Sequence, residues 1–324
     1  MTSCKRLHVA DPFVKRTKMK NPLSPSIVGK ILMPRGSLIG LIYFGFALWL
    51  NATSAESSIS SSYPYAHASN AGWINFQPSA ENGTQVHESF LSGYAYASNF
   101  GWIHFGDGSP ENGFSYSNNG SSDYGVNLAE NGSLSGYAYA PNIGWITFEG
   151  YWGQPCLNFS TGKFVGFAYA GNIGWISLDT EFSDLVASHI IQPTDTDGDG
   201  IADYWEIQYF GNLTTAGLST DSDTDGVADL KEYLAGTNPN DRESRFRIVS
   251  HTYNLSNSTA TIEFTTTKNR MYKIEYDDDL QGTWTDSGHG LVSNSLSSIT
   301  TKAFPYTSGN KRFFRVQSFK PLQP

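Results

Sequence analysis

The stretch Tyr94-Ala-Tyr-Ala-Ser-Asn-Phe-Gly-Trp-Ile-His-Phe105 recurs in four copies along this chain of 324 residues. Each copy has an alternating segment, an Asn-X-Gly turn and a second alternating segment, which is typical of a β-hairpin. The copies follow at a period of about thirty residues, with an insertion before the third, which indicates a repeat architecture. They cover Tyr65–Phe76, Tyr94–Phe105, Tyr137–Phe148 and Phe167–Leu178. We therefore predict a repeat β-meander domain over residues 56–190.

Further strands are expected between these hairpins. Alternating residues precede most copies, as in Tyr124–Ala129, and predict an additional strand there. The first copy lacks such a segment. The segment Phe182–Ile191, which follows the fourth copy, is a candidate for a closing strand.

The length of the hairpin turn decides which face carries the tryptophan. A two- or four-residue turn pairs Ala97 with Trp102 and Tyr96 with Ile103, and directly opposed residues share a face. The tyrosine then lies in the core, and the tryptophan lies on the wetter face beside small alanines. A three-residue turn would reverse this assignment.

One tryptophan occupies the same position in every copy. These residues are Trp73, Trp102, Trp145 and Trp175. A row of indoles on an alanine platform would stack against sugar rings, which makes it a candidate glycan-binding surface. The alternative is that the indoles pack between adjacent repeats, because a repeat protein buries its core through such contacts. Aromatic residues at a fixed period are usually core, so the sequence favours the second interpretation.

The stretch Asp195-Thr-Asp-Gly-Asp-Gly-Ile-Ala-Asp-Tyr-Trp-Glu206 has the spacing of an EF-hand calcium loop, and Asp221–Glu232 repeats it. Acids stand at loop positions 1, 3, 5, 9 and 12, position 7 offers a main-chain carbonyl, and glycine at position 6 permits the sharp turn. The sequence therefore predicts two Ca²⁺ sites. The expected ligands are Asp195, Asp197, Asp199, Ile201, Asp203 and Glu206 in the first loop and Asp221, Asp223, Asp225, Val227, Asp229 and Glu232 in the second.

A metal-free explanation accounts for part of this pattern. Asp203 and Glu206 have the spacing of the N-cap and N3 acids of a capping box, as do the matching acids of the second copy. Capping does not explain the three preceding acids, the glycine or the duplication. A short helix is expected after each loop, ending at Gly211 and at Gly236.

The N-terminal segment resembles a targeting signal. An apolar run over residues 37–50 is followed by Asn-Ala-Thr-Ser-Ala55, which is typical of a signal-peptide core and its cleavage site. We expect residues 1–55 to be a signal peptide, with the true start at Met33, and an uncleaved anchor is the alternative. The chain is then secreted or displayed at the cell surface, without a transmembrane span after cleavage.

Charge and cysteine content narrow the possible partners. Residues 56–241 contain only two lysines against 22 acids, which excludes a nucleic-acid partner for this part of the chain. Cys156 is the single cysteine after the leader, so the sequence predicts no intramolecular disulfide and favours a buried free thiol.

Five alternating segments follow the calcium loops and predict a small β-sandwich over residues 242–324. These segments are Arg245–Ser250, Thr259–Thr265, Met271–Tyr276, Ser298–Phe304 and Arg312–Phe319. The whole chain is thus expected to be mainly β, with a calcium module of two loops and two short helices at residues 191–241.

The paired loops resemble the thrombospondin type 3 repeat of secreted bacterial proteins, which implies calcium binding and no particular activity. Dockerins are a neighbouring family, but here the copies lie 26 residues apart and position 12 is Glu, where dockerins usually have Asp. The C-terminal segment is similar to sandwiches that follow this repeat and end near an aromatic-Arg-Val sequence, here Phe314-Arg-Val316. The Gly-Trp-Ile copies resemble repeats of bacterial surface proteins.

Three functions compete on these observations. The favoured one is a non-enzymatic structural or adhesion protein in which calcium rigidifies the link between two β modules. The alternative is a glycan-binding module that uses the tryptophans, with an extracellular polysaccharide or protein as partner. A secreted hydrolase is the weakest, because neither a Gly-X-Ser-X-Gly nor a His-Glu-X-X-His motif is present. Within that class a glycoside hydrolase or its accessory subunit stays open, because its paired carboxylates meet only in space.

Overall fold

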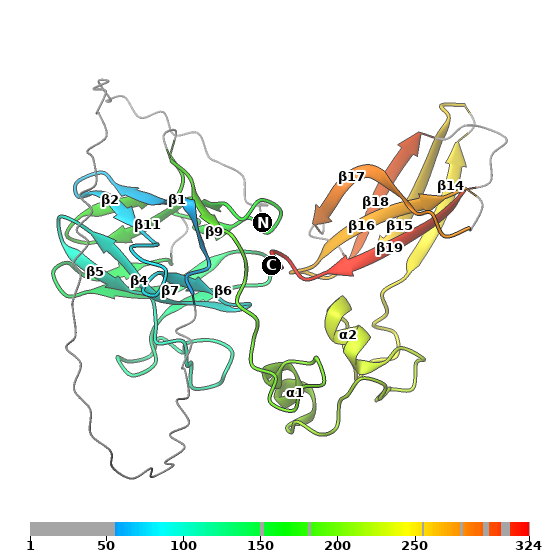
Figure 1. The fold of residues 1–324 in the computed structure, drawn as a ribbon, viewed down its shortest axis with the longest axis horizontal. Helices are drawn as coiled ribbons and strands as arrows, with labels where there is room; N and C mark the ends of the chain where they lie inside the picture. The colour runs from blue at the N-terminus through cyan, green and yellow to red at the C-terminus, as the bar shows by residue number, and fades with distance from the viewer. Residues whose placement is uncertain are drawn as a thin grey trace, which may run out of the picture. The chain divides into compact units, whose positions relative to one another are not determined.

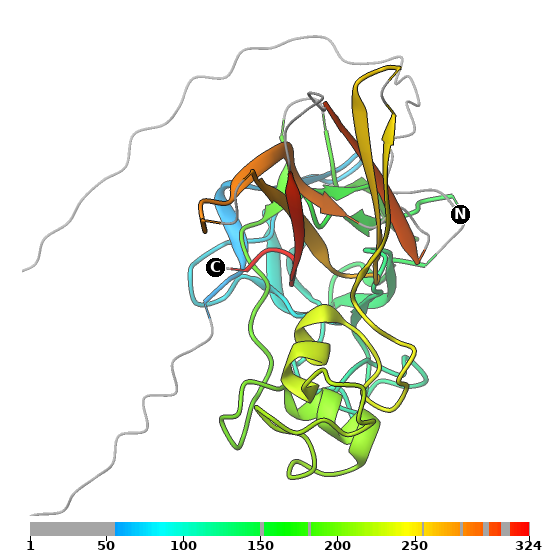
Figure 2. The same cartoon turned by 90° about the vertical axis from the view of Figure 1, so that its right-hand side faces the viewer.

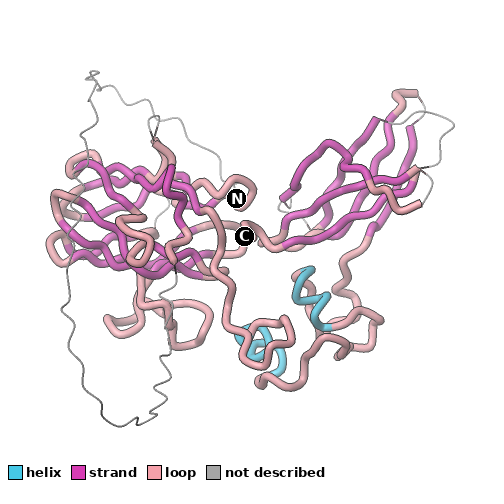
Figure 3. Tube along the Cα trace, in the orientation of Figure 1, coloured by secondary structure: helices cyan, strands magenta, loops and turns pink. Residues whose placement is uncertain are grey.

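The structure is a computed structural model that describes residues 56–149, 152–180, 183–254, 256–278, 281–293, 298–305 and 312–323. The chain is mainly β, as predicted, and its described part contains two short helices (Figures 1 and 3). The proposed signal peptide, including Met33, lies outside the described residues.

The four hairpins join into one closed sheet of eight strands. Along the ring the order is β1-β2-β4-β5-β7-β8-β11-β12, and β12 pairs with β1 to close it. The core is made of small and branched side chains that point into the ring, such as Ala95, Ala97 and Ile103. The strands are β1 (Ile59–Ala68), β2 (Gly72–Asn75), β4 (Phe90–Ala97), β5 (Gly101–His104), β7 (Leu134–Ala140), β8 (Gly144–Thr147), β11 (Phe167–Ala170) and β12 (Gly174–Ser177).

Short strands complete the domain. They are β3 (Thr84–Val86), β6 (Val126–Leu128), β9 (Cys156–Leu157), β10 (Phe164–Val165) and β13 (Leu185–Ala187). Strands β3, β6 and β13 pair with the outer parts of the long strands, and β9 and β10 pair with each other. Strand β13 pairs with β1 through Ile59↔Ala187 and Pro64↔Leu185. The last segment of the domain therefore supplies the strand that the first copy lacks, which confirms the predicted closing strand. Residue 182 of that predicted segment lies outside the described residues.

The predicted hairpin register is wrong. Tyr96 pairs with Trp102 and Ala97 pairs with Gly101, so the turn has three residues. Gly101 has a φ of 88°, and three-residue hairpin loops place a left-handed residue at this point. The alanines therefore point into the core. Each tryptophan lies on the outer face, as expected from the register argument, but beside a tyrosine or histidine instead of beside alanines.

The asparagine of each turn has a structural role. Its side-chain Nδ2 donates a hydrogen bond to a main-chain carbonyl in the turn of the neighbouring hairpin, and the four bonds follow one another around the ring. They run from Asn99 to Ala71 (2.8 Å), from Asn142 to Phe100 (2.9 Å), from Asn172 to Ile143 (2.9 Å) and from Asn70 to Ile173 (3.2 Å). The last of these bonds joins the first hairpin to the fourth, so the turns close in the same way as the strands.

The C-terminal segment forms two three-stranded sheets, drawn in yellow to red in Figures 1 and 2. One has the order β14 (Ile248–Asn254), β15 (Thr259–Thr265), β18 (Ile299–Pro305), and the other β17 (Thr285–Ser293), β16 (Met271–Asp277), β19 (Phe313–Phe319). Phe264 and Phe304 of the first sheet and Tyr272 of the second belong to one shared core. Strand β17 was not predicted, because its glycines and serines hide the alternation.

The prediction that Cys156 is a free thiol is wrong. The residue is buried, and it belongs to a disulfide instead of being a free thiol. Cys4, the other cysteine of the sequence, lies outside the described residues.

Candidate metal centre

Each acidic loop leads into a short helix. Helix α1 (Asp203–Phe210) ends at Gly211, and α2 (Asp229–Ala235) ends at Gly236, both glycines being left-handed, as predicted. The N-caps are Ala202 and Ala228, and neither makes a side-chain cap hydrogen bond. The capping-box explanation is therefore wrong, and the acids of the first helical turn need another partner. Neither helix in the described part of the chain has the length or apolar character to cross a bilayer.

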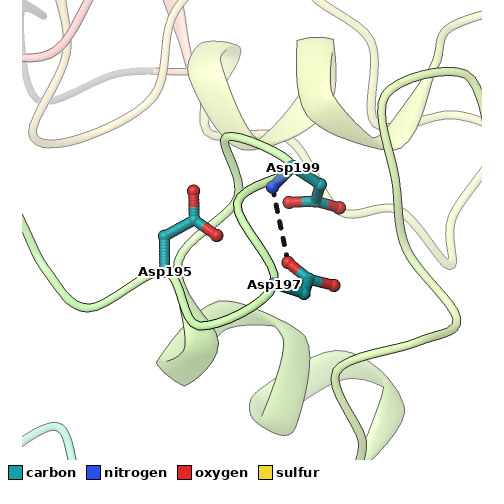
Figure 4. A group of neighbouring side chains, drawn as sticks. All are labelled: Asp195, Asp197 and Asp199. Atoms are coloured by element: carbon teal, nitrogen blue, oxygen red, sulfur yellow. Dashed lines mark hydrogen bonds between the residues drawn. The ribbon is translucent and has the colours of Figure 1, made fainter.

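The first loop gathers three carboxylates on its inner side (Figure 4). Oxygen atoms of Asp195, Asp197 and Asp199 lie within 4.8 Å of one another. Asp195 accepts hydrogen bonds from the N–H groups of Gly198 (2.8 Å) and Gly200 (2.9 Å), which bends the chain around these oxygens. The geometry is that of a loop wrapped around a central point.

The second loop repeats this arrangement with Asp221, Asp223 and Asp225. Asp221 accepts from the N–H of Gly226 at 2.8 Å, as Asp195 does from Gly200. The second loop has a positive charge beside it, because the guanidinium of Arg245 lies 2.9 Å from Asp225 Oδ2. A cation in the second loop would therefore share this carboxylate with an arginine.

The last acid of each loop lies on its helix and is fully buried. Glu206 is 0% exposed and Glu232 is 1% exposed. Burial, and secondarily the neighbouring aspartates, raises the pKa of each carboxyl group to about 7. A buried carboxylate is costly unless a cation or hydrogen-bond donors compensate for the lost water. The two glutamates thus complete a concentration of negative charge in each loop, which Arg245 offsets only in the second.

Several buried carboxylate oxygens of the two loops have no hydrogen-bond partner within the described residues. They are Asp199 Oδ2, Asp223 Oδ2, Glu232 Oε2 and both oxygens of Glu206. Buried polar atoms without partners are rare in folded proteins and require an explanation such as an ion. Oxygen donors in a flexible loop are what Ca²⁺ prefers, so the residues present fit this ion.

Asp203 and Asp229, predicted as ligands at position 9, also hold the loop together. Both oxygens of Asp203 accept hydrogen bonds from Thr196, from its N–H at 2.7 Å and from its hydroxyl at 2.6 Å. Asp229 accepts from the hydroxyl of Thr220 at 2.6 Å and from the N–H of Ser222 at 3.0 Å. These acids tie the start of the loop to the helix, and their role as calcium ligands stays a prediction. The recurrence of a hydroxyl residue at position 2 was the sequence signal for this pairing.

The position-7 carbonyls are compatible with the predicted role. In the part of the chain that the structure describes, no hydrogen bond uses the main-chain oxygen of Ile201 or Val227. Ile201 is itself fully buried in a small core with Trp205 and Tyr233, which fixes the loop against both helices.

The repeat tryptophans do not belong to the core. Trp73, Trp102 and Trp145 are each 46% exposed, and Trp175 is 43% exposed. Each indole packs edge-on against aromatic side chains of its own hairpin, as Trp102 does against Tyr96 at 5.0 Å between ring centroids. The interpretation that they pack as core between repeats is therefore wrong. They form a half-exposed set around the outside of the closed sheet.

Comparison with known proteins identifies one segment. Residues 195–211 match the family model described as the bacterial TSP3 repeat. No curated protein and no solved structure matches the chain. The match covers the first loop and α1, where the carboxylates converge. The family match and the loop geometry together indicate a calcium-binding module in the middle of the chain.

Proposed function

We propose that the chain is a secreted or cell-surface structural protein without enzymatic activity, in which calcium stiffens the link between the repeat sheet and the C-terminal sheets. The extracellular occurrence of bacterial TSP3 repeats supports this setting. One observation carries the proposal: each helix of the calcium module holds a buried loop glutamate and also contacts a β segment.

Helix α1 contacts the repeat sheet. The hydroxyl of Tyr204 donates a hydrogen bond to Glu88, in the connection between β3 and β4, at 2.5 Å. The ring of Tyr204 also packs against Phe114 of the repeat segment, at 5.5 Å between ring centroids. Tyr204 stands two residues before Glu206, so an ion that fixes this glutamate also fixes the contact.

Helix α2 contacts the C-terminal sheets. Arg270, directly before β16, donates from Nε to the carbonyl of Leu234 at 2.7 Å, and Thr267 donates to that of Ala235 at 2.8 Å. These donors satisfy carbonyls that the end of a helix leaves open. The ammonium group of Lys320, which follows β19, lies 3.6 Å from the centre of the Tyr233 ring.

A largely buried ion pair links the repeat segment to the C-terminal segment, and contacts with both helices surround it. Lys320 Nζ lies 2.7 Å from Glu88 Oε1, while Glu88 also accepts from Tyr204 and Lys320 covers Tyr233. The repeat sheet, both helices and the C-terminal segment therefore meet at one polar network. Calcium, when bound, would neutralise the loop carboxylates and so favour the ordered helices that build this network.

The proposal is tested by the double variant Asp197→Ala/Asp223→Ala, with Asp107→Ala, an exposed acid of the repeat segment, as the matched control. In millimolar calcium the wild type and the control should resist proteolysis within residues 191–241 and become sensitive when calcium is chelated. The double variant should be cleaved equally in both conditions. Calcium protection of the double variant, or chelation without effect on the wild type, would refute the proposal.

A further inference from the structure

The outer face of the closed sheet carries a continuous run of aromatic side chains where the second and third hairpins meet. On β4 and β5, Trp102 packs against Tyr96 and Tyr94, at 5.0 and 6.1 Å between ring centroids. On β7 and β8, Trp145 packs against Tyr139 at 4.9 Å. Both indoles are half-exposed, and so are Tyr94 and Tyr96. We call this surface the aromatic seam.

His104 and Tyr124 bridge the two halves of the seam. His104 Nδ1 lies 2.6 Å from the hydroxyl oxygen of Tyr124. The Tyr124 ring packs against Trp145 at 5.0 Å, and the His104 ring packs against Tyr94 at 4.9 Å. Tyr124 comes from the insertion before the third hairpin, which explains why the junction between the second and third hairpins differs from the other junctions of the ring.

The other two tryptophans lack this bridge. Trp73 packs against Tyr65 and His67, and Trp175 packs against Phe167 and Tyr169, so their ring contacts in the described residues stay within one hairpin. They have nearly the same exposure as Trp102 and Trp145. The chain therefore contains its own internal control for the seam.

Strand geometry sets the size of a ligand that would span the seam. His104 pairs with Tyr139, and Tyr139 pairs with Trp145, so Trp145 stands level with His104, two residues along β5 from Trp102. Two strand spacings across the sheet and two residues along it separate the tryptophan Cα atoms by about 12 Å. A ligand that contacts both indoles is therefore a chain and not a single small ring.

Charge and polarity define the ligand class. Residues 56–190 carry eleven acids against one lysine, which repels anionic polymers. The seam combines flat apolar ring faces with hydroxyl and imidazole groups at their edges. A sugar ring presents the complementary pattern, because its C–H face is apolar and its hydroxyl groups lie around the rim.

We propose that the aromatic seam binds a neutral polysaccharide chain, with sugar rings stacked on Trp102 and Trp145 and the His104–Tyr124 pair contacting hydroxyl groups between them. This site is separate from the calcium loops. Its ligand affinity is expected to stay unchanged when calcium is chelated.

The test is a titration of the full-length protein, followed by calorimetry, with neutral hexasaccharides of glucose, xylose, mannose and N-acetylglucosamine. At least one should bind. Trp102→Ala and Trp145→Ala should each weaken binding by about tenfold or more, as expected for a buried aromatic contact. Trp73→Ala and Trp175→Ala should stay within about twofold of the wild type, since exposed side chains outside a site contribute little.

Tyr124→Phe provides a second variant that keeps every ring and removes one hydroxyl group. It should weaken binding while the closed sheet stays folded in thermal unfolding, with no greater loss of stability than one hydrogen bond contributes. The proposal is overturned if none of the four hexasaccharides binds, or if all four tryptophan variants lose affinity equally.

Discussion

The substitution Glu206→Gln/Glu232→Gln tests the charge balance of the calcium loops. Both carboxyl groups have a pKa of about 7 in the folded chain, against an ordinary value of 4.5. An acid whose pKa is higher in the folded than in the unfolded chain binds more protons when folded. Without calcium, the folded state therefore loses stability as the pH rises from about 4.5 to about 7. Glutamine has nearly the same shape as glutamate and cannot ionise, so the double substitution removes this pH-dependent loss of stability.

The magnitude follows from the two pKa values. A pKa difference of one between two states corresponds to about 1.4 kcal/mol. The rise from 4.5 to about 7 therefore lowers the free energy of unfolding by about 3 kcal/mol for each carboxyl group at pH 8. Whole domains are stable by only about 5–15 kcal/mol, so the calcium-free module should be weakly folded at neutral pH. Calcium reverses the effect, because its ligands bind as deprotonated groups. At ten times the dissociation constant, each site adds about 1.4 kcal/mol.

Hydrogen exchange of the α1 and α2 amides, corrected for intrinsic exchange rates, measures this local stability. In chelator, wild-type protection should fall between pH 5 and pH 8, while protection in the double glutamine variant should stay flat and be higher at pH 8. Adding calcium at pH 8 should protect the wild type and leave the variant unchanged. Glu243→Gln, an exposed acid after α2, serves as the control.

Two results would refute the reasoning. One is a wild type whose protection in chelator does not change over this pH range. The other is a glutamine variant that is less protected than the wild type in chelator at pH 8, which would mean that the two glutamates stabilise the empty module.

Three further predictions concern single contacts. Arg245→Gln should tighten calcium binding by the second loop and not by the first in calorimetry, because it removes a cation worth about 1 kcal/mol at 4 Å in water. Asn99→Ala should lower the stability of the closed sheet in thermal unfolding by about 1 kcal/mol, the usual loss for one hydrogen bond. Lys320→Met should cost about 3–5 kcal/mol by leaving Glu88 buried without its cation. Adding Glu88→Gln to Lys320→Met should recover most of that loss, and an unchanged deficit would count against the ion pair.

The calcium loops and their helices were predictable from the sequence because their determinants are local. The acidic side chains of each site come from twelve consecutive residues, and the glycines that end the helices follow soon after them. The position-9 acids show the limit of this reasoning. Spacing identifies Asp203 as an oxygen donor, but only its two hydrogen bonds with Thr196 show that it supports the loop.

The closed sheet shows what only the tertiary structure decided. Alternation predicted the hairpins, yet a turn longer or shorter by one residue moves the side chains of one of the two strands to the opposite face. The left-handed Gly101 selected the three-residue turn, which placed the alanines inside and the tyrosines outside, beside the tryptophans.

Contacts between residues far apart in the chain could not be predicted from the sequence either. The pairing of β1 with β12 closes the ring, and the bond between Glu88 and Lys320 joins residues 232 positions apart. Such contacts depend on where the whole chain brings its segments together, and no local pattern encodes that placement. The sequence alone therefore determined the acidic loops and most of the strands, whereas the aromatic seam and the polar junction depend on contacts between separate segments of the chain.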